Sequence, residues 1–223
     1  MVESPSPSRT ALLAGATGLI GRALLAQLLA AADCKRVTVL VRRAASDIAA
    51  HPKLALRKVD FAKLPAPFPA VDDVYIALGT TIKTAGSQEA FRQVDFDYVV
   101  GVAKAARAAG ATRLAVVSAL GANARSHVFY NRVKGEMQDA VGALGFESVV
   151  IAQPSLLLGD RAAIGQPVRS GEAWAARLLG PAMALVPRGV RPIAATKVAA
   201  ALLATTLAGA PGVRVLSSGQ MQG

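Results

Sequence analysis

One stretch near the amino terminus, residues 11–29 (ALLAGATGLIGRALLAQLL), constrains the fold of this chain more than any other. It begins with an apolar run of the kind that forms a strand buried on both faces. A turn containing Gly15, Gly18 and Gly21 follows, and leucines then recur at helical spacing. Glycines let the backbone turn tightly and approach a pyrophosphate, and the next helix offers free N–H groups and a positive dipole end. The stretch therefore predicts a strand, turn and helix that bind a dinucleotide, although a turn of small residues can also bind nothing.

The remainder of the chain alternates between strand-like and helix-like segments. β-branched or apolar runs predict further strands at residues 36–41, 54–59, 73–78, 113–118, 148–153 and 213–216. Helical periodicity covers residues 88–109 and 196–207. With 53% hydrophobic residues, this alternation predicts an α/β fold, a doubly wound parallel sheet (Rossmann fold) with helices on both faces.

The chain has 223 residues, which suits one domain with a sizeable core. We expect a single NAD(P)-binding domain over residues 10–223. Residues 1–9 are rich in Ser and Pro and predict a disordered tail. Residues 155–192 do not continue the alternation of strands and helices, and there we expect a small lobe on the substrate side of the sheet.

The single cysteine, Cys34, excludes an internal disulfide and gives no sign of an oxidising compartment. The apolar residues 11–32 do not predict a signal peptide, because Arg22 and three glycines interrupt them. Residues 193–208 are broken by Lys197 and are too short to span a bilayer. We therefore expect a soluble, cytoplasmic protein. No cluster of His, Cys and carboxylate residues predicts a metal site.

The formal net charge of +11 raises the local concentration of anions, which suits nucleic acid, phosphorylated ligands or acidic partners. The basic residues are spread along the chain, however, and we favour an inert basic surface over a binding surface as the explanation of the charge. Aromatic residues make up only 4%, which argues against a stacking surface for single-stranded nucleic acid.

The end of the second predicted strand bears on the choice of cofactor. Enzymes that prefer NAD usually place a carboxylate there to hold the ribose 2′-OH, whereas this chain has Val41 followed by Arg42 and Arg43. Two guanidinium groups and no carboxylate suit a 2′-phosphate. The sequence therefore predicts NADP(H) rather than NAD, and the alternative is a solvated arginine pair.

A serine, a tyrosine and a lysine predict the catalytic chemistry. Ser118 ends the fifth predicted strand, and Tyr130 and Lys134 follow four residues apart on one helix face. A free tyrosine, with a pKa of about 10, is a poor acid at neutral pH, but a nearby ammonium favours its phenolate. Ser118 would orient the substrate oxygen. The alternative makes Tyr130 a half-buried helix aromatic and Lys134 a solvated charge.

Further residues at strand ends are expected beside the cofactor. Asp60 either accepts a hydrogen bond from the adenine amino group or caps a turn, while Asp95 and Asp97 are expected to serve the fold or the solvent face. The predicted cofactor contacts are Gly15, Thr17, Gly18, Leu19, Ile20, Gly21, Arg42, Arg43, Asp60, Leu78, Gly79, Thr80, Tyr130, Lys134, Pro154 and Leu157.

Several motifs together resemble a known family. They are residues 15–21 (GATGLIG), 41–43 (VRR), 78–81 (LGTT), 94–98 (VDFDY), 118–122 (SALGA), 129–136 (FYNRVKGE) and 154–158 (PSLLL). The chain resembles the atypical short-chain dehydrogenases, in the branch that contains the Tat-interacting protein and its epimerase-like bacterial relatives. The resemblance implies a Rossmann fold, NADPH binding and catalysis by Ser118, Tyr130 and Lys134, but no known substrate. Related sequences often carry Arg-Pro where this chain has Gln153-Pro154.

Two functions of different classes fit these observations. The first is an NADPH-dependent oxidoreductase that acts on a small carbonyl compound or alcohol. The second is a redox-responsive protein that binds NADPH and controls a protein partner with little turnover. The substrate, the direction of hydride transfer and the oligomeric state stay open.

Overall fold

The computed structural model describes residues 9–44, 47–158 and 187–223. The predicted tail lies outside these residues except for Arg9, and so does most of the predicted lobe at 155–192, namely residues 159–186. Within the described ranges, no helix is long and apolar enough to cross a membrane.

Seven parallel strands form one sheet in the order β3-β2-β1-β4-β5-β6-β9. Their bounds are β1 Arg9–Ala14, β2 Cys34–Val41, β3 Leu54–Lys58, β4 Asp73–Ile76, β5 Arg113–Val117, β6 Ser148–Gln153 and β9 Gly212–Ser217. A separate pair consists of β7 Leu157–Leu158 and β8 Ile193–Ala194. The predicted parallel, doubly wound sheet is therefore confirmed.

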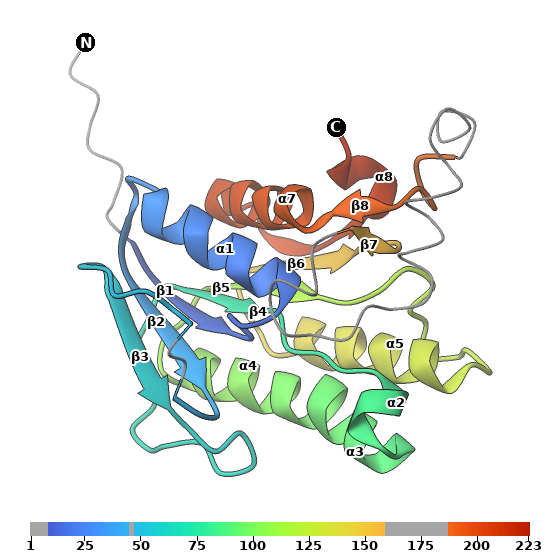
Figure 1. Ribbon diagram of the computed structural model, residues 1–223, viewed down its shortest axis with the longest axis horizontal. Helices are drawn as coiled ribbons and strands as arrows, with labels where there is room; N and C mark the ends of the chain where they lie inside the picture. Colours follow the sequence, from blue (N-terminus) through green and yellow to red (C-terminus); the bar gives the residue numbers. More distant parts are fainter. Residues whose placement is uncertain (1–8, 45–46, 159–186) are drawn as a thin grey trace.

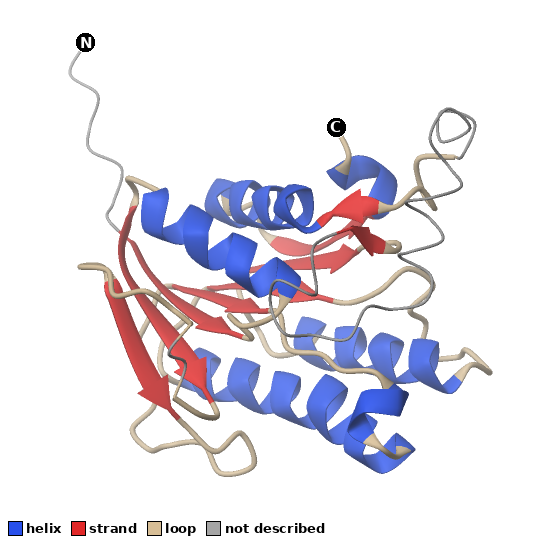
Figure 2. Ribbon diagram, in the orientation of Figure 1, coloured by secondary structure: helices blue, strands red, loops and turns tan. Residues whose placement is uncertain are grey.

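Helices cover both faces of the sheet (Figures 1 and 2). In the described residues the helices are α1 Leu19–Ala30, α2 Ile82–Ala85, α3 Gln88–Arg92, the π-helix η1 Gln93–Asp97, α4 Tyr98–Ala108, α5 Phe129–Gly142, α7 Ala195–Ala208 and α8 Ser218–Met221. Helices α1 and α7 pack on one face, and α4 and α5 on the other.

The alternation of side chains in β1 explains why there are two cores. Leu13 points into the core beneath α1 and α7, whereas Leu12 belongs to the core beneath α4 and α5. Both are 0% exposed, so β1 is buried on its two faces, as its apolar sequence predicts.

The strand order reverses at β1, which lies between β2 and β4. In sheets of this type the chain leaves the carboxyl ends of the two strands at the reversal, here β1 and β4, toward opposite faces, and ligands bind outside those ends. The glycine turn follows β1 and residues 77–80 follow β4. The fold thus brings two of the predicted cofactor segments together.

Candidate cofactor and active site

Two glycines of the turn are required by close backbone contacts. Gly15 has φ +94°, and a Cβ atom there would lie 2.5 Å from the carbonyl oxygen of Ala77, just after β4. A Cβ atom on Gly21 would lie 1.9 Å from the oxygen of Gly15. The turn therefore closes tightly against both α1 and the segment after β4.

The amino end of α1 is free to bind an anion. Gly18 is the N-cap residue of α1 and has no side chain to cap it, and the first turn has no acidic residue. Across the described residues, the backbone N–H groups of Leu19 and Ile20 have no hydrogen-bond acceptor. Arg22 adds a positive charge there, although Asp47 pairs with it. Free N–H groups and the helix dipole fit a pyrophosphate at this end.

A pocket of about 470 Å³ opens beside this end of α1. Leu19, Arg22 and Ala23 line one side, and Leu158 with residues 194–196 of β8 and α7 lines the other. The pocket gives a ligand on the glycine turn room to lie between α1 and α7.

The two arginines at the end of β2 are available to a ligand. Arg42 and Arg43 are both exposed, and neither forms an ion pair or a hydrogen bond within the described part of the chain. They follow β2, the neighbour of β1, at the same edge of the sheet as the glycine turn. This placement fits the phosphate-binding role predicted for them.

Asp60 caps a turn, which was one of its two predicted roles. Its Oδ1 atom accepts a hydrogen bond of 2.9 Å from the Ala62 N–H, and the residue is exposed. Its other carboxylate oxygen has no hydrogen bond in the described structure and can still accept one from a ligand.

Lys134 is held beside the segment after β4 by a buried carboxylate. Its Nζ atom lies 2.8 Å from Asp95 Oδ1, with the two side chains 4% and 1% exposed. The contact is an ion pair rather than a hydrogen bond, because Oδ1 has no partner of hydrogen-bond geometry. Asp95 Oδ2 accepts a hydrogen bond of 2.8 Å from the Thr80 N–H. One carboxylate thus joins α5 to the segment after β4.

Gly79 lies directly against this ion pair. A Cβ atom on it would be 3.4 Å from Asp95 Oδ1 and 3.9 Å from Lys134 Nζ. The predicted cofactor residues Leu78, Gly79 and Thr80 therefore adjoin the predicted catalytic lysine.

Tyr130 stands in the first turn of α5. Its half-buried ring lies 5.3 Å, centroid to centroid, from the ring of Phe91 in α3. Its hydroxyl forms no hydrogen bond to any residue that the structure describes, so it is free to contact a substrate. The helix carries Tyr130 and Lys134 on one face, as their spacing predicts.

The Ser118 hydroxyl forms no hydrogen bond to Tyr130 or Lys134, its two predicted partners, in the described structure. It is 5% exposed, and its Oγ atom accepts a hydrogen bond of 2.6 Å from Gln138 Nε2, two turns beyond Tyr130. Gln138 Oε1 accepts in turn from Gln153 Nε2, at 3.1 Å. Ser118 therefore follows β5 at the expected edge, but its side chain is bound to α5 by an amide.

Pro154 and Leu157 continue this edge of the sheet. The Pro154 carbonyl accepts a hydrogen bond of 2.9 Å from the Leu120 N–H, and Leu157 pairs with Ile193 in the small sheet. Leu157 thereby joins the segment after β6 to the segment before α7.

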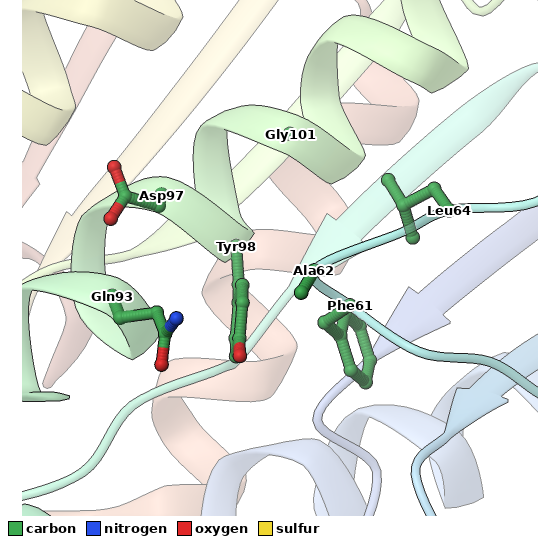
Figure 3. A pocket seen from close by; sticks show the side chains of 7 residues that line it. All are labelled: Phe61, Ala62, Leu64, Gln93, Asp97, Tyr98 and Gly101. Atoms are coloured by element: carbon green, nitrogen blue, oxygen red, sulfur yellow. The ribbon is translucent and has the colours of Figure 1, made fainter.

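A second pocket, of about 330 Å³, lies between the loop after β3 and the start of α4 (Figure 3). Its lining residues are Phe61, Ala62, Leu64, Gln93, Asp97, Tyr98 and Gly101. In Figure 3 the Tyr98 ring stands between Gln93 and Phe61, and the Asp97 carboxylate points away from it. No residue predicted for the cofactor or for catalysis lines this pocket.

Sequence reasoning missed two residues that the site uses. Asp95 was expected to serve the fold or the solvent face, and Gln138 was given no role. Asp95 falls four residues after Phe91 and four before Val99, both fully buried, so a carboxylate in an apolar helical stripe was the available signal. Gln138 falls eight residues after Tyr130, on the same helix face.

Comparison with known proteins identifies similar sequences and folds. The model of a family described as NAD(P)H-binding matches residues 15–154. The chain is 39% identical to the mitochondrial protein FMP52 of Eremothecium gossypii over 152 residues, a match that covers 68% of this chain and 67% of that protein. It is 34% identical over 174 residues to the protein HTATIP2 of Rattus norvegicus, covering 76% and 69% of the two chains.

Solved structures agree on the fold. The WbmG enzyme of Bordetella bronchiseptica, in complex with NAD, superposes with a TM-score of 0.69 at 17% identity. The superposition covers 98% of this chain and 75% of that chain. At such low identity the likeness concerns the fold alone.

The relatives correct one prediction. The prediction of a cytoplasmic protein is wrong, because FMP52 relatives from three fungi are named as mitochondrial proteins. The prediction depended on the absence of a signal peptide and of a membrane span, and neither absence distinguishes the cytoplasm from the inside of an organelle.

Proposed function

Because this chain belongs to the NAD(P)H-binding family, we propose that it is an NADPH-dependent oxidoreductase that acts on a small carbonyl compound or alcohol. Its similarity to HTATIP2 confirms the resemblance to the branch that contains the Tat-interacting protein. The fold is that of NAD(P)-binding enzymes. The choice of NADPH, the substrate class and the catalytic residues make up the proposal.

The observation that carries the proposal is the position of Lys134. A buried ammonium group costs free energy unless it is paired. Lys134 is paired with Asp95, and it borders Gly79 at the edge where the strand order reverses. Tyr130 is one helical turn away with a free hydroxyl. A cation and a phenol on one helix face at this edge suit proton transfer beside a bound nucleotide.

When bound, the nicotinamide cofactor supplies or accepts the hydride. Gly15, Gly18 and the amino end of α1 would hold the pyrophosphate, and Lys134 borders the segment that would contact the ribose. Tyr130 gives its proton to the substrate oxygen during reduction, and the charge of Lys134 stabilises the phenolate that results. Ser118 offers a hydroxyl at the end of β5 to orient that oxygen.

The proposed preference for NADPH depends on Arg42 and Arg43. Both are exposed and unpaired within the described ranges, beside the strand end where a ribose 2′-phosphate would lie, and the position that holds a carboxylate in NAD-preferring enzymes is Val41. Charge-assisted hydrogen bonds from a guanidinium fork favour the phosphate over a hydroxyl.

A panel of small aldehydes, ketones and alcohols, assayed with NADPH or NADP⁺ on wild type and Tyr130→Phe, tests the proposal. We expect turnover of at least one compound by wild type and a loss of about 100-fold or more in kcat/KM in the variant, because general acid catalysis is worth that much. Phenylalanine preserves the ring contact with Phe91, so the fold is retained.

Two results would contradict the proposal. Equal turnover by Tyr130→Phe would remove the tyrosine from the chemistry. Tight NADPH binding with no turnover of any compound would favour the second function, a redox-responsive protein that controls a partner.

A further inference from the structure

A chain of two amide side chains ends on Ser118. It starts at Gln153, the last residue of β6, whose Nε2 donates to Gln138 Oε1 at 3.1 Å. It continues from Gln138 Nε2 to Ser118 Oγ at 2.6 Å. Gln138 is eight residues after Tyr130 and four after Lys134, so α5 presents three polar groups on one face.

The half-buried amides of Gln138 and Gln153 border the apolar core on the α5 side of the sheet. Val116, two residues before Ser118 on the same strand face, is 1% exposed, and Met137, beside Gln138, is 0% exposed. Ser118 is buried, and a buried polar group costs free energy unless it has a partner, which Gln138 supplies. Glutamine at position 153 completes the set with a neutral side chain, so no charge is added next to Gln138.

The amide chain has a direction. A hydroxyl has one hydrogen and can accept as well as donate. Since Ser118 Oγ accepts from Gln138, its hydrogen is not used in this contact, and Ser118 donates to no acceptor among the residues that the structure describes. If the residue at position 138 could only accept, Ser118 would donate its hydrogen to that residue and could not donate it to a substrate.

We propose that Gln138 and Gln153 are positioning residues. By donating to Ser118 Oγ, Gln138 leaves the hydroxyl hydrogen of Ser118 available to donate to the carbonyl oxygen of the substrate. The inference rests on the proposed function, in which Ser118 orients that oxygen. It adds two residues that never touch the substrate and that act through the direction of one hydrogen bond.

Gln138→Glu tests the direction of the hydrogen bond between residue 138 and Ser118, because the side chain keeps almost the same shape. A carboxylate only accepts, so Ser118 must donate to it and loses its donor function. We expect kcat for carbonyl reduction to fall about 10- to 100-fold, comparable with Ser118→Ala, because one donor to a developing oxyanion is worth about that much or more. The NADPH dissociation constant stays within about twofold of wild type. Gln88→Glu, on the exposed first turn of α3, is the matched control and keeps wild-type kcat.

The double variant Gln138→Glu/Gln153→Arg separates the effect of the Ser118 hydrogen-bond direction on kcat from the effect of the substitution on protein stability. Arginine supplies donors and a counter-charge to the carboxylate, so we expect the urea midpoint to return toward that of wild type. The Ser118 hydrogen is still drawn to the carboxylate introduced at position 138, so kcat stays low. Recovery of kcat together with the midpoint would overturn the proposal and leave the glutamines a purely structural role.

The contact itself is tested without turnover. In urea unfolding of Ser118→Ala, Gln138→Met and the double variant, a shared hydrogen bond makes the double variant lose less than the sum of the single losses. Additive losses of unfolding free energy would show that Ser118 and Gln138 do not interact, which would overturn the proposal even if no substrate were found. Wild-type kcat in Ser118→Ala would instead contradict the proposed role of Ser118, and wild-type kcat in Gln138→Glu alone would contradict the proposed direction.

Discussion

Asp95 connects two segments of the site through its two carboxylate oxygens. Oδ1 lies 2.8 Å from Lys134 Nζ, and Oδ2 accepts from the Thr80 N–H at 2.8 Å. Both charges of the ion pair are almost fully buried. Such a pair adds little to stability compared with apolar residues, but removing one partner leaves the other charge buried without compensation.

Asp95→Asn is therefore expected to lower the free energy of unfolding by about 3 kcal/mol, measured in urea at neutral pH. Lys134→Met in that background removes the unpaired ammonium, so the double variant is expected to lose less than the sum of the single losses. Asp97→Asn, an exposed change two residues away, is the control and shifts stability by less than about 0.5 kcal/mol. Strictly additive losses would show that the two residues do not interact.

Sequence periodicity could not have placed Asp95 with certainty. Residues 88–109 are predicted as one helix of regular period, but the structure has the π-helix η1 at Gln93–Asp97. A π turn has one more residue than an α turn, so it rotates the face that follows. Val94 and Tyr98 are therefore only half-buried, while Asp95 is 1% exposed.

The amino ends of β1 and β4 are joined by a second acidic residue, at the edge opposite the site. Asp72 Oδ2 accepts from the Thr10 N–H at 2.7 Å and from its hydroxyl at 2.8 Å. Burial by itself raises the pKa of Asp72, but the bonds from Thr10 and the charges of Arg9 and Arg113 outweigh it and hold this pKa below its ordinary value.

This lowered pKa predicts how stability depends on pH. A carboxyl group with a folded-state pKa below the unfolded value of about 3.9 stabilises the fold above that pH and loses its contribution as pH falls through the folded pKa. Asp72→Asn is expected to cost about 1 kcal/mol at pH 7 and progressively less below pH of about 4. Urea unfolding across pH measures this, with the exposed Asp33→Asn as control. A cost that did not change with pH would contradict the account.

The predicted strands of the main sheet all appear, with ends that differ by three residues or fewer. For example, the strand predicted at 73–78 ends at Ile76. After it, the Ala77 N–H still donates to the Ala14 carbonyl of β1, but the Thr80 N–H donates to the Asp95 side chain. The strands β7 and β8 are two residues each, too short to show any periodicity, and they were not predicted.

At the scale of the whole molecule, topology accounts for most of the site. The sheet order places the glycine turn, Arg42, Gly79 and Ser118 at one edge, although 103 residues separate Gly15 from Ser118 in the sequence. Strand–helix alternation was enough to predict this, since the carboxyl ends of parallel strands share an edge. It could not predict which side chains pair there, because Lys134 with Asp95 and Ser118 with Gln138 depend on packing between α5 and its neighbours.

The central claim is that this edge binds NADPH through the glycine turn and the two arginines. Its most direct test is calorimetric titration of NADPH and of NADH into wild type, Arg42→Ala/Arg43→Ala, and the control Lys35→Ala/Arg36→Ala, which removes two exposed charges at the other end of β2. We expect wild type and control to bind NADPH more tightly than NADH. The arginine variant should lose about 100-fold in NADPH affinity, equivalent to two charge-assisted hydrogen bonds, with NADH binding unchanged. Equal affinity of wild type for the two nucleotides, or binding of neither, would contradict the account.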